Sequence, residues 1–352
     1  MLPAMAPSPK RRPPESLAPG VDTPGRAVTL RDVAKVAGVS AITVSRALSR
    51  PDLVTPATLE RVREVVSRTG YVPNVLAGSL KSRRSRIVAA VFPQITTTLF
   101  VDTIQALTDR LRQDGYQVLL GLSAYGERED ELVAGILGRR PDALFLTGIR
   151  HSPAMRRQVL ASRIPVVEAW DLSPSPIDML VGFSHEAAGA AMARHLLSRG
   201  HREIGLAWAD DERALVRRQG FLAALAEAGV RPVAECRLEA PSSFHLGREG
   251  LARLLASGKR LRAIACSSDN LAQGAIAEAL DRGMAIPGDL AVMGFGDLEF
   301  AAHTTPALST IGIDKAAIGR LAAEALLERL AGREGPAAAI DVGFEVLARA
   351  ST

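Results

Sequence analysis

Residues 28–50 read VTLRDVAKVAGVSAITVSRALSR, a stretch that divides into two short helical patterns around a glycine. Thr29, with Asp32 three residues later, is the signature of a capping box at the start of the first helix. Gly38 supplies the backbone freedom for a tight turn. Ser40 is a second N-cap residue and opens the next helix. The stretch therefore predicts two helices that meet at a tight turn.

A third helix is predicted a few residues downstream. Thr55 and Pro56 combine a capping residue with a proline in the first helical turn, and apolar residues then recur at helical spacing as far as Gly70. Two helices that are joined by a tight turn and braced by a third form a helix-turn-helix. The alternative is an ordinary small helical bundle with no role in DNA binding.

The distribution of charge favours the first of these interpretations. The whole chain has a net charge of +5 at pH 7. Residues 26–86 contain twelve Lys and Arg side chains against four Asp and Glu, a net charge of +8, so the remaining residues sum to −3. A basic block joined to a near-neutral body is the pattern expected of a module that binds a polyanion. We therefore interpret residues 27–72 as a helix-turn-helix DNA-binding domain.

In such a domain the second helix enters the major groove through its N-terminal residues. Arg46 could make a bidentate contact to guanine, whereas Ala41 and Ile42 could contact thymine methyl groups. The short hydroxyl side chains nearby suit phosphate oxygens, namely those of Thr29, Thr43 and Ser45. The candidate DNA contacts of this domain are therefore Thr29, Ser40, Ala41, Ile42, Thr43, Ser45 and Arg46.

From residue 87 onward the pattern changes to alternating strands and helices. The run IVAAVF (87–92) has the length of a buried strand, helices and strands follow in turn, and the same rhythm restarts near residue 201. This alternation predicts parallel sheets covered by helices. Two successive units of this kind predict two Rossmann-like lobes with a ligand cleft near the carboxyl ends of their strands. The expected fold class is an N-terminal all-α helix-turn-helix domain followed by a two-lobed α/β core.

The sequence of the body lacks the motifs of common enzyme classes. Its six histidines show no metal-binding spacing. No GxGxxG motif or phosphate loop follows the first strand, and no serine lies in a GxSxG motif. We therefore expect no enzyme activity, no cofactor and no metal. The alternative from another functional class is a carbohydrate-binding protein or a sugar-modifying enzyme with a basic tail.

The N-terminal residues and the cysteines indicate the compartment. Residues 1–26 are rich in Pro and Ala, so we expect a disordered tail, and they contain no apolar segment of signal-peptide length. No apolar run approaches the roughly 20 residues needed to span a bilayer. Cys236 and Cys266 lack the spacing of a metal site or a disulfide and are expected to be buried small apolar residues. These features predict a cytoplasmic protein with no membrane partner.

The stretch TLRDVAKVAGVSAITVSRAL, followed by GYVPNVLAGSLKS, resembles the N-terminal region of the lactose-repressor family of bacterial transcription regulators. In that family the YxPN run leads into a hinge helix that folds on operator DNA, enters the minor groove and wedges a leucine into the central base step. The resemblance implies a hinge helix and linker at residues 73–86. It assigns the wedge to Leu80, with Asn74, Ala77 and Lys81 beside it.

The body resembles the periplasmic-binding-protein-like core of the same family, and within the family it is most similar to the gluconate operon repressor branch. The matching landmarks include VGFSHEAAG (181–189), SSDNLAQGA (267–275) and IPGDLAVMGFGD (286–297). The resemblance implies that residues 87–352 form an effector-binding and dimerisation core. The chain is then expected to cross between the two lobes near residues 183, 311 and 340.

Carried over residue by residue, the resemblance also implies the effector contacts. Arg217 matches an arginine that holds the ligand in many members, and Trp170 would be a stacking platform. Asp269 has the alternative role of a helix cap, Phe183 that of plain core, and Arg217 that of a surface residue. Gly296 stands where many sugar-binding members have Asp, which leaves the ligand's hydroxyl pattern open. The implied contacts are Thr97, Phe100, Glu168, Trp170, Phe183, Arg217, Ser268, Asp269 and Asp297.

The resulting functional expectation is a DNA-binding repressor of sugar-acid catabolism genes. We expect a homodimer that binds palindromic double-stranded operator DNA and leaves it when a small sugar-acid effector, gluconate or ketogluconate, is bound. A regulator of the same family that answers a different sugar, or that acts with a corepressor, is the alternative.

Overall fold

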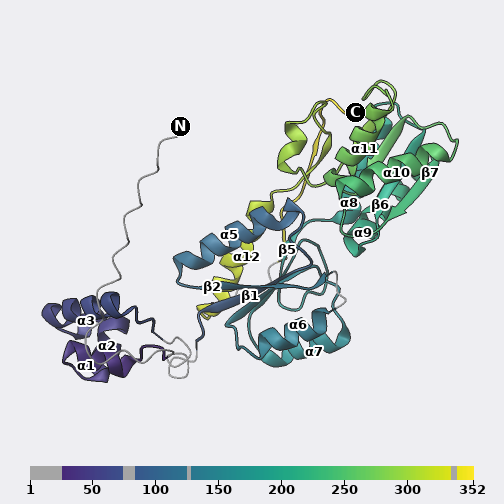
Figure 1. Cartoon of the computed structure of the whole chain (residues 1–352). Coiled ribbons are helices and arrows are strands. Elements are labelled where there is room, and N and C mark those ends of the chain that lie inside the picture. The colour runs from purple at the N-terminus through teal and green to yellow at the C-terminus, as the bar shows by residue number, and fades with distance from the viewer. Residues whose placement is uncertain (1–25, 74–83, 125–127, 334–338) are drawn as a thin grey trace, which may run out of the picture. The chain divides into compact units, whose positions relative to one another are not determined.

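The computed structural model describes residues 26–73, 84–124, 128–333 and 339–352 (Figure 1). The chain divides into two units, Met1–Arg83 and Arg84–Thr352. The predicted tail and the predicted hinge contacts Asn74, Ala77, Leu80 and Lys81 lie outside the described residues.

The first unit is helical, as its apolar pattern predicts. Its elements are α1 (Leu30–Ala37), α2 (Ala41–Ser49), the 3-10 turn η1 (Pro51–Leu53) and α3 (Pro56–Thr69). One side chain from each helix is fully buried in the shared core, namely Val33, Val44 and Val62. Because each helix is too short to be stable alone in water, this shared core holds the unit together.

Local signals set where these helices begin and turn. The Thr29 amide donates to Asp32 Oδ2 at 2.8 Å, and the Asp32 amide donates to Thr29 Oγ1 at 3.4 Å, which completes the predicted capping box. Gly38 ends α1 in the left-handed region at φ 65°, and Ser40 caps α2. Thr55 caps α3, with a proline at its first turn. The predicted caps and the predicted glycine turn are confirmed.

The second unit has two lobes, and the first lobe contains a six-stranded parallel sheet in the order β11-β5-β4-β3-β1-β2. Its strands are β1 (Ile87–Phe92), β2 (Gln117–Leu122), β3 (Ala143–Thr147), β4 (Val166–Ala169), β5 (Met179–Gly182) and β11 (Ala339–Asp341). Its helical segments are η2 (Thr98–Phe100), α5 (Val101–Gln113), α6 (Glu129–Leu137), α7 (Pro153–Ser162) and α12 (Lys315–Leu330).

The sequence of strand β1 is continuously apolar because helices cover both of its faces. Val88, Ala90 and Phe92 belong to the core that includes residues of α5 and α12, whereas Ala89 and Val91 belong to the core with α6 and α7. Side chains alternate across a strand, so a strand covered by helices on both faces needs apolar residues at every position.

The second lobe contains a four-stranded parallel sheet in the order β7-β6-β8-β9. Its strands are β6 (Ile204–Ala209), β7 (Ala234–Leu238), β8 (Ala263–Cys266) and β9 (Ala291–Met293). Its helical segments are α8 (His185–Ser198), α9 (Glu212–Glu227), α10 (Phe244–Ala256), α11 (Asp269–Asp281) and the 3-10 turn η4 (Glu299–Ala302). Helix α8 packs on α9, and α10 packs on α11. Both cysteines are buried here without a disulfide, as predicted.

Three chain segments link the lobes: the one from β5 to α8, the one from β10 (Thr310–Gly312) to α12, and the one from β11 to β12 (Glu345–Leu347). The apolar run DVGFEV (341–346) does not form one continuous strand. Strand β11 pairs with β5, whereas β12 pairs antiparallel with β10. The break lies at Gly343, which has φ 66° and donates its amide to Asp341 Oδ1 at 2.8 Å, a turn that interrupts strand geometry. In the described part of the chain, no helix is both long and apolar enough to cross a membrane.

Candidate functional site

The solvent-facing side of α2 carries the residues expected to read DNA. Ile42 is 65% exposed, although it lies within two residues of the fully buried Val44. An outward apolar side chain and an outward guanidinium are the chemistry that recognises a thymine methyl group and the acceptor edge of guanine. The other predicted contacts on and before this helix are exposed or half-buried, namely Ser40, Ala41, Thr43, Ser45 and Arg46.

Two of the three hydroxyl groups predicted to hold phosphates, those of Thr29 and Thr43, are already engaged at helix caps. Thr29 Oγ1 donates to Asp32 Oδ2 at 2.6 Å, and this hydrogen bond lowers the pKa of Asp32. Ser40 and Thr43 share a hydrogen bond between their hydroxyls at 2.8 Å. A phosphate at these positions would therefore compete with the caps for the same protons.

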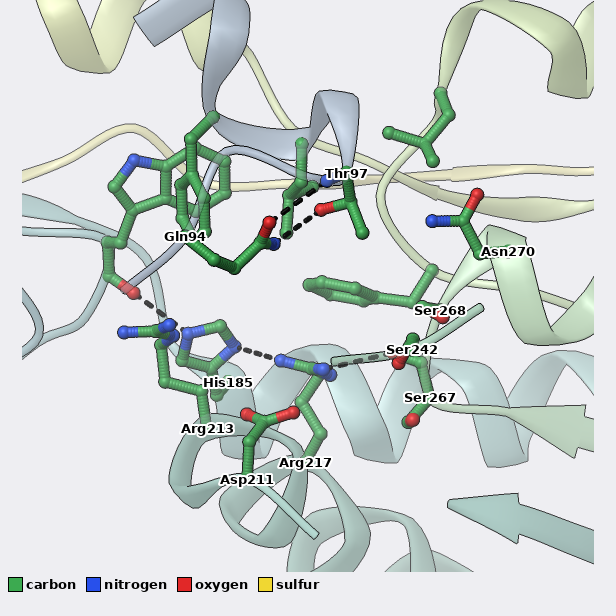
Figure 2. Close-up of a pocket in the computed structure, with 15 residues that line it drawn as sticks. Gln94, Thr97, His185, Asp211, Arg213, Arg217, Ser242, Ser267, Ser268 and Asn270 are labelled. Carbon is green, nitrogen blue, oxygen red and sulfur yellow. Dashed lines mark hydrogen bonds between the residues drawn. The ribbon is translucent and has the colours of Figure 1, made fainter. Parts of the chain in front are cut away.

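The second unit contains a pocket to which both lobes contribute (Figure 2). Gln94, Thr97 and Phe100 come from the loop after β1, and Trp170 comes directly after β4. These are carboxyl ends of parallel strands, where ligands bind in open α/β sheets. The remaining lining residues are Leu99 from the first lobe, and His185, Asp211, Arg213, Arg217, Ser242, Ser267, Ser268, Asn270, Phe295 and Leu298 from the second.

Arg217 is the most deeply buried charged residue that lines this pocket. Its guanidinium carbon lies 3.7 Å from the centroid of the Phe295 ring, its Nη2 donates to the Ser267 carbonyl at 3.0 Å, and its Nη1 lies 2.9 Å from His185 Nδ1. Burial lowers the pKa of Arg217 to about 10, so the side chain stays protonated at neutral pH. Among the described residues its guanidinium forms no ion pair within 4 Å, and its Nε has no hydrogen-bond partner. The charges of Asp211 and Asp171 act on this guanidinium only from beyond ion-pair distance. A buried cation without a direct ion-pair partner is unfavourable, so the pocket is suited to an anion.

The backbone under Arg217 is held by unusually close helix packing. A Cβ at Gly189 of α8 would lie 1.9 Å from the Arg217 carbonyl oxygen, and a Cβ at Gly220 of α9 would lie 1.9 Å from the Glu186 carbonyl oxygen. Only glycine allows two helix backbones to approach this closely. The contact fixes where α9 presents its arginine to the pocket.

Trp170 forms part of an aromatic cluster at the pocket wall. Its ring meets Phe100 edge-on with a centroid distance of 4.9 Å, and it meets Phe183 in the same manner at 6.2 Å. The backbone of Trp170 has φ 71°, a strained conformation for an aromatic residue. Its indole Nε1 is buried and has no hydrogen-bond partner among the described residues.

Polar side chains opposite the arginine complete the pocket. Gln94 Nε2 donates to Thr97 Oγ1 at 2.6 Å, and Gln94 Oε1 accepts the Thr97 amide at 2.9 Å. The side chains of Ser242 and Asn270 make no hydrogen bond to another described residue, and both are labelled at the pocket in Figure 2. Groups of this kind can donate to and accept from the hydroxyls of a small ligand.

Five of the nine predicted effector contacts line this pocket: Thr97, Phe100, Trp170, Arg217 and Ser268. The other four lie behind its wall. Glu168 is buried, accepts the Ile177 amide at 2.6 Å and lies 3.4 Å from His151 Nε2. Its neighbours Val167 and Ala169 belong to the core that includes α5 and α12, so Glu168 points to the opposite face of the sheet, since side chains alternate across a strand. The left-handed backbone of Trp170 breaks this alternation.

Phe183, Asp269 and Asp297 do not line this pocket and contact other parts of the fold. Phe183 is fully buried core. Asp269 accepts the Leu298 amide at 2.8 Å and the Thr310 hydroxyl at 2.6 Å. Burial raises its pKa to about 6. The capping role considered for Asp269 belongs to Ser268, whose hydroxyl accepts the amide of Leu271.

Asp297 forms an ion pair with Arg349 at 2.7 Å and does not line the pocket. Its φ of 46° is a left-handed conformation, which carries the chain from β9 toward η4. The side chain is thereby turned to the C-terminal segment.

Several pocket residues were not predicted from the sequence, chiefly His185, Asp211, Arg213 and Asn270. His185 and Asn270 lie inside motifs used for the resemblance, VGFSHEAAG and SSDNLAQGA. Asp211 had a local signal, because it is the N-cap of α9 and accepts the Ala214 amide at 3.0 Å. No local signal brings these four side chains together. Within the described ranges, no three His, Cys, Asp or Glu side chains form a group that could hold a metal ion.

Comparison with known proteins agrees with both parts of the chain. Residues 29–74 match the model of bacterial regulatory proteins of the lacI family, and residues 193–352 match the periplasmic binding protein-like domain. The chain is 42% identical to the HTH-type transcriptional regulator GntR of Pseudomonas aeruginosa, over 92% of this chain and 95% of that protein.

Solved structures give the same result. A lacI-family transcriptional regulator from Silicibacter pomeroyi is 32% identical, with a TM-score of 0.87 over 92% of this chain and 99% of that one. The lac repressor dimer bound to operator and the anti-inducer ONPF is 25% identical, with a TM-score of 0.80 over 93% of this chain and 99% of that one. The chain belongs to the lacI family of bacterial regulatory proteins, and it is a transcriptional regulator with a helix-turn-helix DNA-binding domain and a periplasmic-binding-protein-like core.

Proposed function

We propose that this regulator is a homodimeric repressor of sugar-acid catabolism genes, and that a small sugar acid such as gluconate or ketogluconate releases it from its operator. The observation that carries the proposal is the buried guanidinium of Arg217, which forms no ion pair within 4 Å among the described residues. A guanidinium fork binds a carboxylate through two parallel hydrogen bonds. The effector's acid group would supply the missing ion-pair partner.

The rest of the pocket supports a polyhydroxylated ligand. Ser242 and Asn270 offer unengaged polar groups, and Phe295 offers an apolar face. His185 has both ring nitrogens engaged, at 2.8 Å to the Trp170 carbonyl and 2.9 Å to Arg217. It is therefore a poor general base, because a base must have a free nitrogen near the substrate. The pocket is suited to binding rather than to catalysis.

At the DNA end, α2 would lie in the major groove, with Arg46 on guanine and Ile42 against thymine methyl groups. The hinge residues Asn74, Ala77, Leu80 and Lys81 would occupy the minor groove, with Leu80 wedged between bases. Effector binding would change the lobe arrangement, separate the paired hinges and lower operator affinity. This is a coupling between two distinct sites.

A dimer is needed because two half-sites of a palindrome are read by two copies of the domain. The second unit offers a surface for it along β2, the outermost strand of the six-stranded sheet. Leu120 and Leu122 on that strand are 38% and 46% exposed. An edge strand with outward apolar side chains is favourable for pairing with another chain.

The proposal is tested by calorimetry of the full chain with gluconate, 2-ketogluconate, 5-ketogluconate and their phosphates. A gel-shift on a palindromic operator at fixed salt then follows, with and without the acid that binds. We expect one sugar acid to bind and to abolish the shifted band. A band that strengthens with the acid would instead indicate a corepressor. Absence of any specific band, or binding of neutral sugars alone, contradicts the proposal.

A further inference from the structure

His185 connects the arginine of the pocket to the other lobe. It is the first residue of α8, directly after the segment that crosses from β5, and its side chain is buried. Its Nε2 lies 2.8 Å from the carbonyl oxygen of Trp170 in the first lobe, and its Nδ1 lies 2.9 Å from Arg217 Nη1 in the second (Figure 2). The imidazole is thus the middle member of a chain of hydrogen bonds between the lobes.

The two partners determine the protonation state of the ring. A guanidinium can only donate hydrogen bonds, so the His185 Nδ1 that faces it must carry the lone pair. A carbonyl oxygen can only accept, so the Nε2 that faces Trp170 must carry the proton. The geometry therefore allows one form only, the neutral Nε2–H tautomer. Burial and then the charges of Arg217 and Arg213 also hold the pKa of His185 well below its usual value.

The Trp170 end of this chain is held rigidly. The Trp170 amide donates to the Val181 carbonyl at 3.0 Å, and the residue is kept at φ 71°. A Cβ at Gly182 would lie 2.1 Å from the Asp171 carbonyl oxygen. The turn at residues 170–171 can therefore pack against β5 only because position 182 is a glycine. Backbone strain of this kind persists only when its surroundings determine it fully. The Trp170 carbonyl group, which orients His185, is consequently held in one position.

The Arg217 end faces the pocket. Of the five N–H groups of a guanidinium, one is used by His185 and one by the Ser267 carbonyl. The Nε–H is among those without a partner in the described residues. Because the fork is planar, fixing two of its N–H groups sets the direction of those left for a ligand. The ring of Phe295 supports the same plane from one face.

We infer that His185 is a positioning residue for the effector: as the neutral Nε2–H tautomer it aligns the Arg217 fork with the acid group of the ligand and ties that fork to the Trp170 turn of the other lobe. This inference rests on the proposed function, since it takes Arg217 to be the group that binds the acid. It adds that His185, which among the described residues is the only histidine lining this pocket, acts through Arg217 and does not touch the ligand.

Substitutions of His185 separate positioning from simple space filling. The amide of Gln carries an acceptor and a donor that are spaced much like the two ring nitrogens, so His185→Gln should bind the sugar acid within about 3-fold of wild type. His185→Leu fills similar space but bonds to neither partner and should lose about 10- to 100-fold in affinity. Should the leucine variant fail to fold, as judged by circular dichroism, His185→Asn replaces it, because its shorter side chain cannot span the two partners.

A matched control lies on the same helix. His195 faces Thr352 Oγ1 at 2.8 Å and is not part of the pocket, so His195→Leu should leave effector affinity unchanged. Equal affinity of wild type and His185→Leu overturns the inference, and so does an equal loss in the glutamine and leucine variants.

A second measurement needs no ligand and therefore separates failure of this inference from failure of the proposed function. Nitrogen-15 NMR of the full chain, labelled at histidine and assigned with His185→Gln, reports which ring nitrogen carries the proton. We expect the neutral Nε2–H form throughout pH 6 to 8 in the effector-free protein. A Nδ1–H or doubly protonated ring at pH 7 overturns the inference even if gluconate binds. If the tautomer is as expected and no sugar acid binds, the proposed function fails and takes the effector-positioning role with it, whereas the hydrogen-bonded arrangement of His185 between Trp170 and Arg217 stands.

Discussion

Arginine side chains on the outward face of α2 and in the pocket around Arg217 differ in their exposure to water. Arg46 on α2 is exposed and keeps its hydration, whereas Arg217 is buried against an aromatic ring with two neutral acceptors as partners. An exposed arginine gains modestly from a partner because water competes, while a buried one gains far more. We therefore expect DNA binding to depend on many weak contacts and effector binding to depend chiefly on one strong contact at Arg217.

The largest expected effect is at Arg217. Arg217→Met keeps much of the side-chain volume and removes the charge, so the sugar acid should bind about 100- to 1,000-fold more weakly, because two charge-assisted hydrogen bonds are lost. Calorimetry measures this. Arg218→Met is the matched control, because Arg218 lies next in sequence and pairs with Glu235 on the surface. A loss shared by both variants would contradict the assignment of the anion site.

A second contrast concerns pH. His151 lies 3.4 Å from both Glu129 Oε1 and Glu168 Oε1 with its side chain 2% exposed. Burial alone lowers its pKa, but the two carboxylates outweigh burial and raise the pKa to about 9. A raised folded-state pKa gives stability that is present below pH 6.5 and is lost as pH rises through 9.

We therefore expect the free energy of unfolding of the α/β unit to fall by about 3 kcal/mol between pH 6.5 and 9.5. Urea titrations at several pH values measure it, and His151→Gln should flatten the dependence on pH. Among residues 26–73 no buried side chain is polar or charged, so the helical unit should lack this step. An unchanged slope in His151→Gln would show that other groups are responsible.

The third prediction targets the helix contact beneath the pocket. Gly189→Ala places a methyl group 1.9 Å from the Arg217 carbonyl oxygen, so α8 and α9 must separate. We expect a loss of about 2 kcal/mol in the free energy of unfolding together with weaker effector binding. The control is Ala190→Ser, at a half-buried position of α8. Gly229→Ala cannot serve, because Gly229 has φ 66° and alanine would be strained there. Stability equal to wild type would mean that the two helices are not packed this closely.

The smallest expected effects are on α2. Arg46→Ala should weaken operator binding by about 1–3 kcal/mol, and Ile42→Ala should weaken it by about 1 kcal/mol. Each loss of affinity should appear only with operators that carry the base pair which the removed side chain contacts. Gel-shifts of each variant with a series of operators that differ by single base pairs measure this. Arg63 is an exposed arginine of α3 outside the predicted base contacts, so Arg63→Ala should weaken binding to all sequences equally by removing a general attraction to phosphate. Effector affinity should stay at the wild-type value in all three variants, which separates the two regions.

Much of the helical unit was predictable because its signals are local. The capping box at Thr29, the left-handed turn at Gly38 and the cap at Ser40 each depend on residues within four positions of one another. The exposed side of α2 follows from the same periodicity, since Val44 and Ala47 had to face inward. The sequence does not distinguish a phosphate-binding role of the Thr29 hydroxyl from a capping role. In the structure this hydroxyl serves the cap.

The pocket was predictable only in part, for a physical reason. The resemblance implied Thr97, Trp170 and Ser268 as effector contacts, and these three residues line the pocket. Glu168 and Asp297 carry equally suitable chemistry but face His151 and Arg349. One position along a strand, or one left-handed residue, turns a side chain from the pocket into the core, and sequence spacing does not resolve such steps.

The sequence by itself determined the two-part organisation, the basic character of the first unit, the caps of its helices and the two rounds of strand–helix alternation, because each depends on composition or near neighbours. Only the tertiary structure decided which polar side chains share the pocket, how His185 lies between Trp170 and Arg217, and that the last strand is divided at Gly343. Those outcomes depend on contacts between residues that are tens of positions apart, and such contacts form only when the chain has folded.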